Sequence, residues 1–213
     1  MYSAVITADI VNSTKLSAGV EKELMKKLKA LLAPYKSEFF RGDSFQVYLK
    51  EAEEALKVLL LCRTAAIGIS ETETIGDIRC SLGIGSVMPP IRALGSARGE
   101  AFLLSGRSFD KLPKEGRRLK ISIDHELAQT AVDILSDYLD AIYAQMSAKQ
   151  AAVIMELLQG RSQQEAAEKL GRSKSTVNQH VSAGRWEEIE NLLSKYRLIL
   201  EQVKKQETQE NLQ

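Results

Sequence analysis

The chain has 213 residues, of which 44% are hydrophobic, which is enough to bury a core in one large or two small domains. Its 29 Lys and Arg residues nearly balance 28 Asp and Glu residues. The net charge of only +1 excludes a strongly basic protein that binds nucleic acid through its overall charge. Asp9 interrupts the short apolar start, and no apolar run approaches the ~20 residues of a membrane span, so we expect a cytoplasmic protein with no signal peptide and no membrane contact.

The metal-binding and redox residue types are few. Cys62 and Cys80 lie in separate apolar runs, and His125 and His180 are the only histidines. This spacing excludes a CxxC motif and argues against a zinc site. We expect both thiols to be buried and unreactive.

The first part of the chain predicts an α+β layer. Gly42-Asp43 is a strong hairpin signal, because both residues tolerate the positive φ that tight hairpin turns need. The βαββαβ order predicts a ferredoxin-like fold with an antiparallel sheet backed by two helices. The expected elements are a strand at Tyr2–Ala8, a helix at Ala18–Leu32, strands at Ser37–Arg41 and Ser44–Leu49, a helix at Glu51–Ile69 and a strand at Ile78–Val87, followed by a helix near Arg98–Leu112 and a strand near Leu119–Ile123.

Two carboxylates are expected to converge in this layer. Asp9 ends the first predicted strand, and Asp43 lies in the hairpin that the fold places beside that strand. Carboxylates with a backbone carbonyl suit Mg²⁺ or Mn²⁺, which in turn holds nucleotide phosphates. The alternative is that Asp9 caps a turn and Asp43 merely occupies a hairpin position.

The segments ADIVNST (8–14) and RGDSFQVYL (41–49) resemble the two metal-binding motifs of class III nucleotidyl cyclases. With SARGEAFLLSGRSFDKL (96–112), they resemble more closely the SatD family of cyclase-like bacterial proteins, whose activity is poorly defined. The resemblance implies metal binding by Asp9 and Asp43 and a phosphate contact by Arg107, hence a nucleotide or another phosphorylated small molecule as ligand.

The same resemblance argues against ordinary nucleotide cyclisation. Leu103 replaces the asparagine that the family places four residues before the arginine, and Phe39 and Ser96 fall where a purine-selecting lysine and aspartate are expected. Leucine cannot orient a ribose, and Phe and Ser cannot form a charged purine clamp. We therefore expect ligand sensing or dimerisation from this layer rather than catalysis.

A long amphipathic helix, His125 to about Gln145 with Asp124 as its cap, is expected to join the layer to the rest of the chain. No Gly/Ser/Pro-rich linker interrupts it. A helical connection transmits orientation between two domains more rigidly than a flexible tether, and it also offers a dimer contact.

Three short helices are predicted between Met146 and Arg185. Ser147, Ser162 and Ser173 stand at N-cap positions, and Glu165 completes a capping box with Ser162. Gly160 and Gly171 are suited to end the first two helices in a left-handed conformation. The tight turn between the second and third helices, together with inward-pointing Val177 and Val181, predicts a helix-turn-helix.

The third helix presents a polar outer face that suits the major groove of double-stranded DNA. Asn and Gln pair bidentately with adenine, and Lys reaches guanine or phosphate. Five basic and two acidic residues between Arg161 and Arg185 predict weak binding by one module, so we expect a homodimer on DNA. The alternative is an ordinary three-helix cap with a polar face. The expected DNA-binding residues are Arg172, Lys174, Ser175, Thr176, Asn178, Gln179 and Arg185.

This block resembles region four of bacterial sigma factors and the related LuxR-type DNA-binding domains. The matching residues include Gly160, Ser162, Glu165, Gly171 and Val177. What the resemblance implies is DNA binding by the helix that begins at Ser173.

The last predicted helix runs from Val181 through Val203, and its apolar stripe either pairs with a second copy or folds back on the connecting helix. The expected organisation is a SatD/cyclase-like domain at 1–123, a connecting helix at 124–145, a helix-turn-helix domain at 146–203 and a frayed tail at 204–213.

Three functions compete for this organisation. The first is a DNA-binding transcription regulator with a degenerate cyclase-like domain that senses a ligand or forms a dimer. The second is a metal-dependent nucleotide-binding or nucleotide-processing enzyme that its helix-turn-helix localises. The third is an adaptor that docks on RNA polymerase or another protein.

Overall fold

The computed structural model describes residues 2–40, 42–70 and 76–210. In this part of the chain, a mixed sheet has the strand order β2-β3-β1-β4-β5. Its strands are β1 (Ser3–Val11), β2 (Lys36–Phe40), β3 (Ser44–Leu49), β4 (Asp77–Gly85) and β5 (Leu119–Ile123). The first four strands pair antiparallel in the ferredoxin-like order, and β5 adds to β4 in parallel. The predicted fold class is confirmed.

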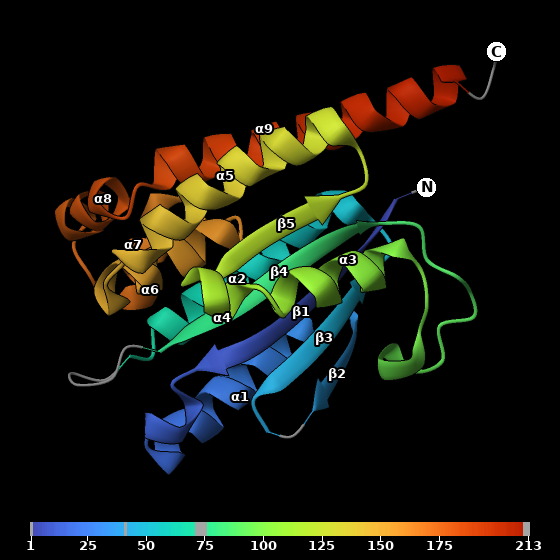
Figure 1. Ribbon diagram of the computed structural model, residues 1–213. Helices are drawn as coiled ribbons and strands as arrows, with labels where there is room; N and C mark the ends of the chain where they lie inside the picture. Colours follow the sequence, from blue (N-terminus) through green and yellow to red (C-terminus); the bar gives the residue numbers. More distant parts are fainter. Residues whose placement is uncertain (1, 41, 71–75, 211–213) are drawn as a thin grey trace.

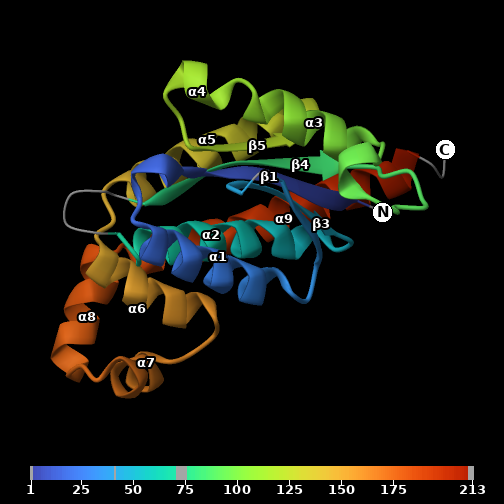
Figure 2. The ribbon, with the colours of Figure 1, turned by 90° about the horizontal axis from the view of Figure 1, so that it is seen from below.

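Helices cover both faces of this sheet, as Figures 1 and 2 show. Alternate residues of β1 (Ala4, Ile6, Ala8 and Ile10) are buried in the apolar core together with α1 (Ala18–Leu32) and α2 (Ala55–Ile67). The other face of β1 carries Ser3, Thr7 and Asp9 beside two valines, and Thr7 hydrogen-bonds Ser105 of α3 (Glu100–Phe109) at 2.6 Å. The period of two along the strand therefore separates an apolar face from one that carries its polar side chains.

Helix α3 approaches the sheet closely because β4 carries a glycine beneath it. A Cβ atom on Gly83 would lie 2.2 Å from the carbonyl oxygen of Ala101. Ser81 also donates a hydrogen bond of 2.6 Å to the Ser105 carbonyl oxygen. A short helix, α4 (Leu112–Glu115), then returns the chain to β5.

The second half of the chain is helical. Helix α5 (Glu126–Ala144) packs on β5, and α6 (Ala148–Leu158), α7 (Gln163–Leu170) and α8 (Lys174–Ala183) form a compact group beyond it. Helix α9 (Trp186–Glu210) runs back along α5. Among the described residues, no helix is long and apolar enough to cross a membrane.

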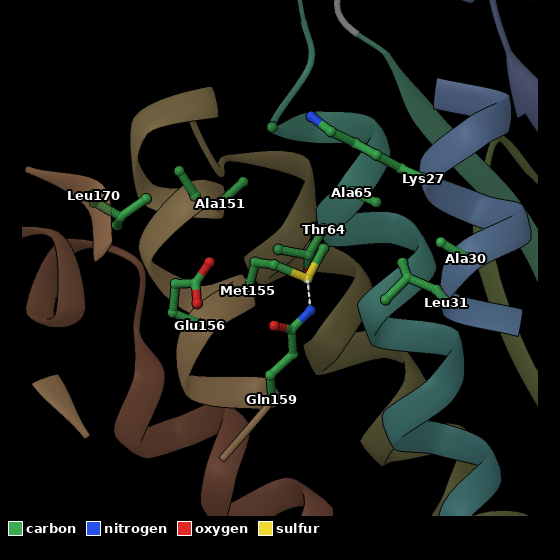
Figure 3. Close-up of a pocket in the computed structure, with 12 residues that line it drawn as sticks. Lys27, Ala30, Leu31, Thr64, Ala65, Ala151, Met155, Glu156, Gln159 and Leu170 are labelled. Carbon is green, nitrogen blue, oxygen red and sulfur yellow. Dashed lines mark hydrogen bonds between the residues drawn. The ribbon is translucent and has the colours of Figure 1, made fainter. Parts of the chain in front are cut away.

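The helical half is joined to the sheet layer by a shared core. Helix α6 packs directly against α2, and Figure 3 shows Ala65 of α2 and Ala151 of α6 in this seam, with α1 beside them. Tyr196 of α9 donates a hydrogen bond of 2.7 Å to the Ala52 carbonyl oxygen near the start of α2. Apolar residues of both halves form one continuous cluster.

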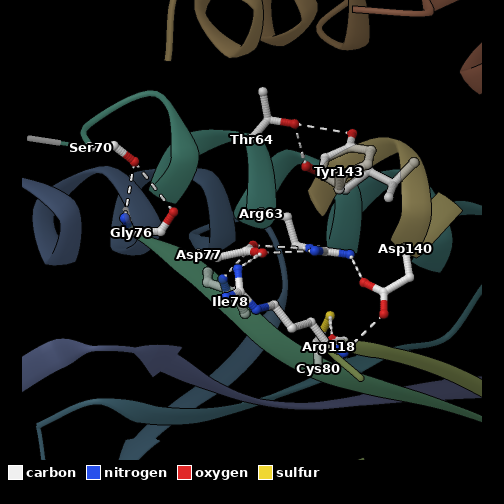
Figure 4. A network of polar contacts seen from close by, with 11 residues as sticks. Arg63, Thr64, Ser70, Gly76, Asp77, Ile78, Cys80, Arg118, Asp140 and Tyr143 are labelled. Carbon is white, nitrogen blue, oxygen red and sulfur yellow. Dashed lines mark hydrogen bonds and ion pairs between the residues drawn. The ribbon is translucent and has the colours of Figure 1, made fainter. Parts of the chain in front are cut away.

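A buried ionic cluster lies between the sheet and α5, as Figure 4 shows. Arg63 of α2 is fully buried and donates to both carboxylate oxygens of Asp77 at 3.0 and 2.8 Å. It also donates to Asp140 of α5 at 2.8 Å. Arg118, just before β5, completes the cluster with a contact of 2.9 Å to Asp77. One arginine thus links α2, β4 and the connecting helix.

The structure corrects several local predictions. Asp9 lies inside β1 rather than at its end, because the strand continues to Val11. The N-cap of α5 is His125 instead of Asp124, since its Nδ1 accepts from the Ala128 amide. Arg41, expected to end the second strand, lies outside the described residues.

The chain after Val181 also differs from the prediction. The expected single helix is interrupted at Gly184 and Arg185, where Arg185 has φ 58°, so α8 and α9 are separate helices. Helix α9 folds back on the connecting helix, which was one of the two alternatives. It continues to Glu210, and Lys204 pairs with Glu53, so most of the expected frayed tail is helical.

Candidate functional site

The starts of α6, α7 and α8 are fixed by serine caps, as the sequence predicts. Ser147 accepts a hydrogen bond from the amide of Gln150, Ser162 from the amide of Glu165, and Ser173 from the amide of Thr176. The first two caps are complete capping boxes, in which the Gln150 and Glu165 side chains bond back to the cap amides. These contacts satisfy backbone donors that the helix itself leaves unpaired.

The turn between α7 and α8 depends on Gly171, which adopts the left-handed conformation at φ 60° and ψ 38°. Ala166 and Ala167 of α7 are buried opposite the inward-pointing valines of α8, Val177 and Val181. The small alanine side chains let the helices approach, and the valines fill the space between them. The predicted helix-turn-helix geometry is therefore present.

The outward face of α8 is polar and accessible. Lys174, Ser175, Asn178 and Gln179 are exposed, whereas Thr176 is half-buried and its hydroxyl lies 2.9 Å from that of Ser173. Together with Gln163 and Gln164 of α7, three of the α8 side chains line a hollow of about 520 Å³ at the N-terminal ends of both helices. These ends carry positive partial charge, so the hollow suits a polyanion.

The two predicted arginine contacts are placed differently. Arg172 is exposed and lines a cavity beside α8. Arg185 instead contacts Glu188 at 2.9 Å, hydrogen-bonds the Tyr138 hydroxyl and stacks 5.0 Å from the Tyr138 ring. Its guanidinium thus ties the start of α9 to α5. No local pattern predicts this contact, because Tyr138 precedes Arg185 by 47 residues.

The structure brings Asp9 and Asp43 together at one end of the sheet. Asp9 pairs in register with Ser44, and the Ile10 amide donates a hydrogen bond of 3.0 Å to the Asp43 carbonyl oxygen. The Asp43 carboxylate accepts from Ser13 at 2.9 Å. The β2–β3 hairpin therefore places the second carboxylate beside the first, as expected.

Arg79 is the member of this site that sequence reasoning missed. It lies opposite Asp9 in the β1–β4 register, forms an ion pair with the Asp9 carboxylate, and stacks 5.7 Å from the Phe109 ring. Burial raises the pKa of the Asp9 carboxyl, the Arg79 hydrogen bond and charge oppose that rise, and the charge of Asp43 adds to it. This pairing follows only from the register of β1 with β4, two strands that are neighbours in the sheet but far apart in the sequence.

Among the residues that the structure describes, three buried polar atoms around this pair have no hydrogen-bond partner: Asp9 Oδ1, Arg79 Nε and Gln46 Oε1. Gln46 donates to Thr7 at 3.2 Å, so all three side chains belong to the polar face of the sheet. Buried polar atoms in folded proteins are normally paired. The unpaired atoms mark this as the part of the sheet suited to a polar ligand.

Arg107 lies in the last turn of α3 and is exposed. Within the described residues, no hydrogen bond or ion pair joins it to Asp9 or Asp43. Phe39, where a purine-selecting lysine was expected, packs against Phe45 at 5.4 Å between ring centroids. Leu103 is 49% exposed on α3. The carboxylate pair is thus present without the other groups that a cyclase resemblance would supply.

Residues 136–187 match the family model described as Sigma-70, region 4. The matched segment includes all of α6, α7 and α8 and begins in the last part of α5. The chain therefore carries a Sigma-70 region 4 helix-turn-helix, which indicates DNA binding. No curated protein matches the chain.

Some solved structures are distantly similar to part of the chain. The active GGEEF domain of a diguanylate cyclase from Vibrio cholerae is 15% identical with a TM-score of 0.41, covering 59% of this chain and 84% of that one. A bacterial light-regulated adenylyl cyclase is 13% identical with a TM-score of 0.39, covering 57% and 75%. The guanylyl cyclase Cya2 is 12% identical with a TM-score of 0.32, covering 50% and 68%. Similarities at this level carry no information about activity.

Proposed function

We propose that this protein is a transcription regulator that binds double-stranded DNA through α8. The observation that carries the proposal is the exposed polar face of α8 within a complete Sigma-70 region 4 helix-turn-helix. Asn178 and Gln179 offer bidentate hydrogen bonds to base edges, and Lys174 offers a charge to guanine or phosphate. A cytoplasmic location and the resemblance to the SatD family fit this role.

We infer that the regulator works as a homodimer. A single module carries little excess positive charge, so two copies on one duplex would supply the affinity. Helix α2 of the sheet layer packs on α6, and the Arg63 cluster holds the connecting helix α5 on the sheet, which would permit a signal to pass to α8. We assign ligand sensing or dimerisation to this layer.

The test is fluorescence anisotropy with two labelled duplexes: one that the purified protein selects from a pool of DNA fragments, and a scrambled duplex of the same composition. Asn178→Ala and Gln179→Ala should each weaken binding to the selected duplex by about 1–3 kcal/mol and leave scrambled DNA nearly unchanged. Arg172→Ala should weaken binding to both duplexes alike. It should also reduce the slope of log binding constant against log salt concentration by about 1, as expected for the loss of one phosphate contact. Arg185→Ala should lower stability instead, because its partners are Glu188 and Tyr138. Equal losses on all duplexes for every variant would contradict the assignment.

A second candidate is a metal-dependent nucleotide-binding or nucleotide-processing site, favoured by the convergence of Asp9 and Asp43. The unpaired Asp9 Oδ1 is an acceptor that a cation would satisfy, and Mg²⁺ commonly binds through only one or two carboxylates. Asp9 and Asp43 would hold Mg²⁺ or Mn²⁺, which when bound would neutralise the phosphates of a nucleotide. Arg79 already pairs with Asp9 and lowers the charge available to a metal.

Calorimetric titration with Mn²⁺ separates this site from a purely structural ion pair. Arg79→Gln should strengthen binding, because it frees the second Asp9 oxygen, and Asp43→Asn should abolish it. Absence of binding in both the wild type and Arg79→Gln would exclude the metal site. Nucleoside triphosphate turnover that disappears in Asp43→Asn would favour an enzyme.

A further inference from the structure

The seam between the sheet layer and the helix-turn-helix contains a cavity of about 360 Å³. Figure 3 shows its walls: Ala30 and Leu31 of α1, Ala65 of α2, Met155 of α6 and Leu170 of α7. The lining is mainly apolar, and the walls come from both halves of the molecule. A pocket of this size and character is typical of a small-molecule site.

The polar groups around this first cavity already have partners. Glu156 is held by Arg161 at 2.6 Å and by Lys169 at 3.0 Å. Lys27 pairs with Glu23 at 2.8 Å on α1. The hydroxyl of Thr64 donates to the Leu60 carbonyl oxygen at 2.6 Å. The first cavity therefore presents apolar surface to an occupant and offers little to a charged group.

A second cavity of about 380 Å³ adjoins the first and shares Gly68, Ala152 and Leu170 in its walls. Its remaining lining includes the basic side chains Lys149, Arg172 and His180. Within the part of the chain that the structure describes, none of these three has a carboxylate within ion-pair distance. The N-terminal end of α6, at Ala148 and Lys149, adds positive partial charge to the same space.

We infer that the two cavities form one binding site for a small amphipathic organic anion. Its apolar body would occupy the space between α1, α2, α6 and α7, and its anionic group would lie among Lys149, Arg172 and His180. The charges decide the orientation, because Lys149 and Arg172 have no ion-pair partner among the described residues, whereas Glu156 and Lys27 of the first cavity are paired.

This site connects ligand binding to DNA binding, a step that rests on the proposed function. Arg172 and the α8 residue Thr176 line the second cavity and belong to the predicted DNA contacts. An anion bound at Arg172 would compete with a DNA phosphate for the same guanidinium and would repel that phosphate. The anion therefore acts as an inducer that releases DNA.

The direct test is isothermal titration calorimetry of the full chain with octyl phosphate, below its micelle concentration. We expect saturable binding with one site per chain, and binding of octanol and of inorganic phosphate at least tenfold weaker. Butyl phosphate should bind about 250-fold more weakly than octyl phosphate, because each of the four missing methylenes contributes about fourfold. Octanol binding as tight as that of octyl phosphate, or no saturable binding, would overturn the inference.

Two variants place the ligand in the seam. Ala152→Trp fills the wall that both cavities share and should weaken octyl phosphate binding at least tenfold, whereas the matched Ala141→Trp on the exposed face of α5 should leave it unchanged. Lys149→Glu changes an exposed side chain and should weaken binding without affecting the fold, which thermal melting checks for all three variants. Unchanged binding in both Ala152→Trp and Lys149→Glu would exclude this site.

Displacement of labelled DNA separates the two proposals. Octyl phosphate should release DNA from the wild type and from Ala141→Trp but not from Ala152→Trp. If octyl phosphate binds in the calorimeter but the protein binds no DNA, the anion site stands and the DNA-binding function is refuted. If the protein binds DNA but not octyl phosphate, the DNA-binding function stands and the anion site is refuted.

Discussion

The molecule contains two ionic groupings on β4 that differ in completeness. Asp77, at the start of the strand, receives Arg63, Arg118 and the Ile78 amide, and Arg63 is also bound by Asp140. Arg79, two residues later, pairs with Asp9, yet each of these side chains keeps a buried atom that no other described residue contacts by a hydrogen bond. The first grouping is satisfied internally, and the second is not.

This difference separates a structural role from a candidate binding role. A buried charge is tolerated when its neighbours satisfy it, and a complete network gives rigidity to the elements that it joins. The Arg63 cluster joins α2, β4 and α5, so it fixes the connecting helix on the sheet. The Asp9–Arg79 pair retains unpaired atoms near Asp43, where an added ligand would find partners.

The largest expected effect follows removal of the central arginine. Arg63→Met should lower the free energy of unfolding by about 3–5 kcal/mol, because it leaves Asp77 buried without its main partner. Urea denaturation followed by circular dichroism measures this change. The control is Arg197→Met, which removes an exposed ion pair with Glu54 and should cost at most about 1 kcal/mol. Similar losses for both variants would contradict a structural role for the cluster.

A smaller loss is expected at the edge of the same cluster. Asp140→Asn keeps the shape of the side chain but weakens its contacts with Arg63 and the Arg118 amide, and should cost about 1–3 kcal/mol. Asp137→Asn, on the same helix and 60% exposed, is the matched control and should have little effect. Thermal unfolding compares the two. A larger loss of stability for Asp137→Asn would contradict this account, because it would show that the exposed ion pair with Arg117 holds α5 more firmly than the Arg63 cluster does.

The smallest effect, and the one that depends on pH, is expected at Asp9. Because the pKa of this carboxyl is raised in the folded state, its contribution to stability is fully present below its unfolded pKa and is lost as pH rises through the folded value. The free energy of unfolding of the wild type, minus that of Asp9→Asn, should therefore fall as pH rises through this range. Denaturation at a series of pH values measures the difference. A difference that increases with pH would show that Arg79 outweighs burial.

Local signals in the sequence predicted the helical half well. Ser147, Ser162 and Ser173 begin helices at the expected residues, and Gly171 adopts the expected left-handed turn. Each of these features depends on residues within one turn of a helix. In the sheet layer, the bounds of α1, β3 and β5 were also predicted to the residue from short-range patterns.

The missed features depend on residues far apart in the sequence. Arg63 stands in an apolar helical run, and nothing nearby shows that Asp77 and Asp140 will surround it. The Asp9–Arg79 pair requires the register of β1 with β4, and the position of Arg185 requires the packing of α9 on α5. The convergence of Asp9 and Asp43 was predictable only because a recognisable strand order brings the hairpin beside β1.

The most direct test of the central claim is genome-wide selection of DNA fragments by the purified protein at moderate salt. The control is a Lys174→Ala, Asn178→Ala, Gln179→Ala triple variant, whose changes lie on the exposed face of α8 and should preserve the fold. The account predicts that the wild type enriches a recurrent inverted repeat and that the triple variant does not. Equal recovery of fragments by both proteins, with no shared sequence, would contradict DNA recognition by α8.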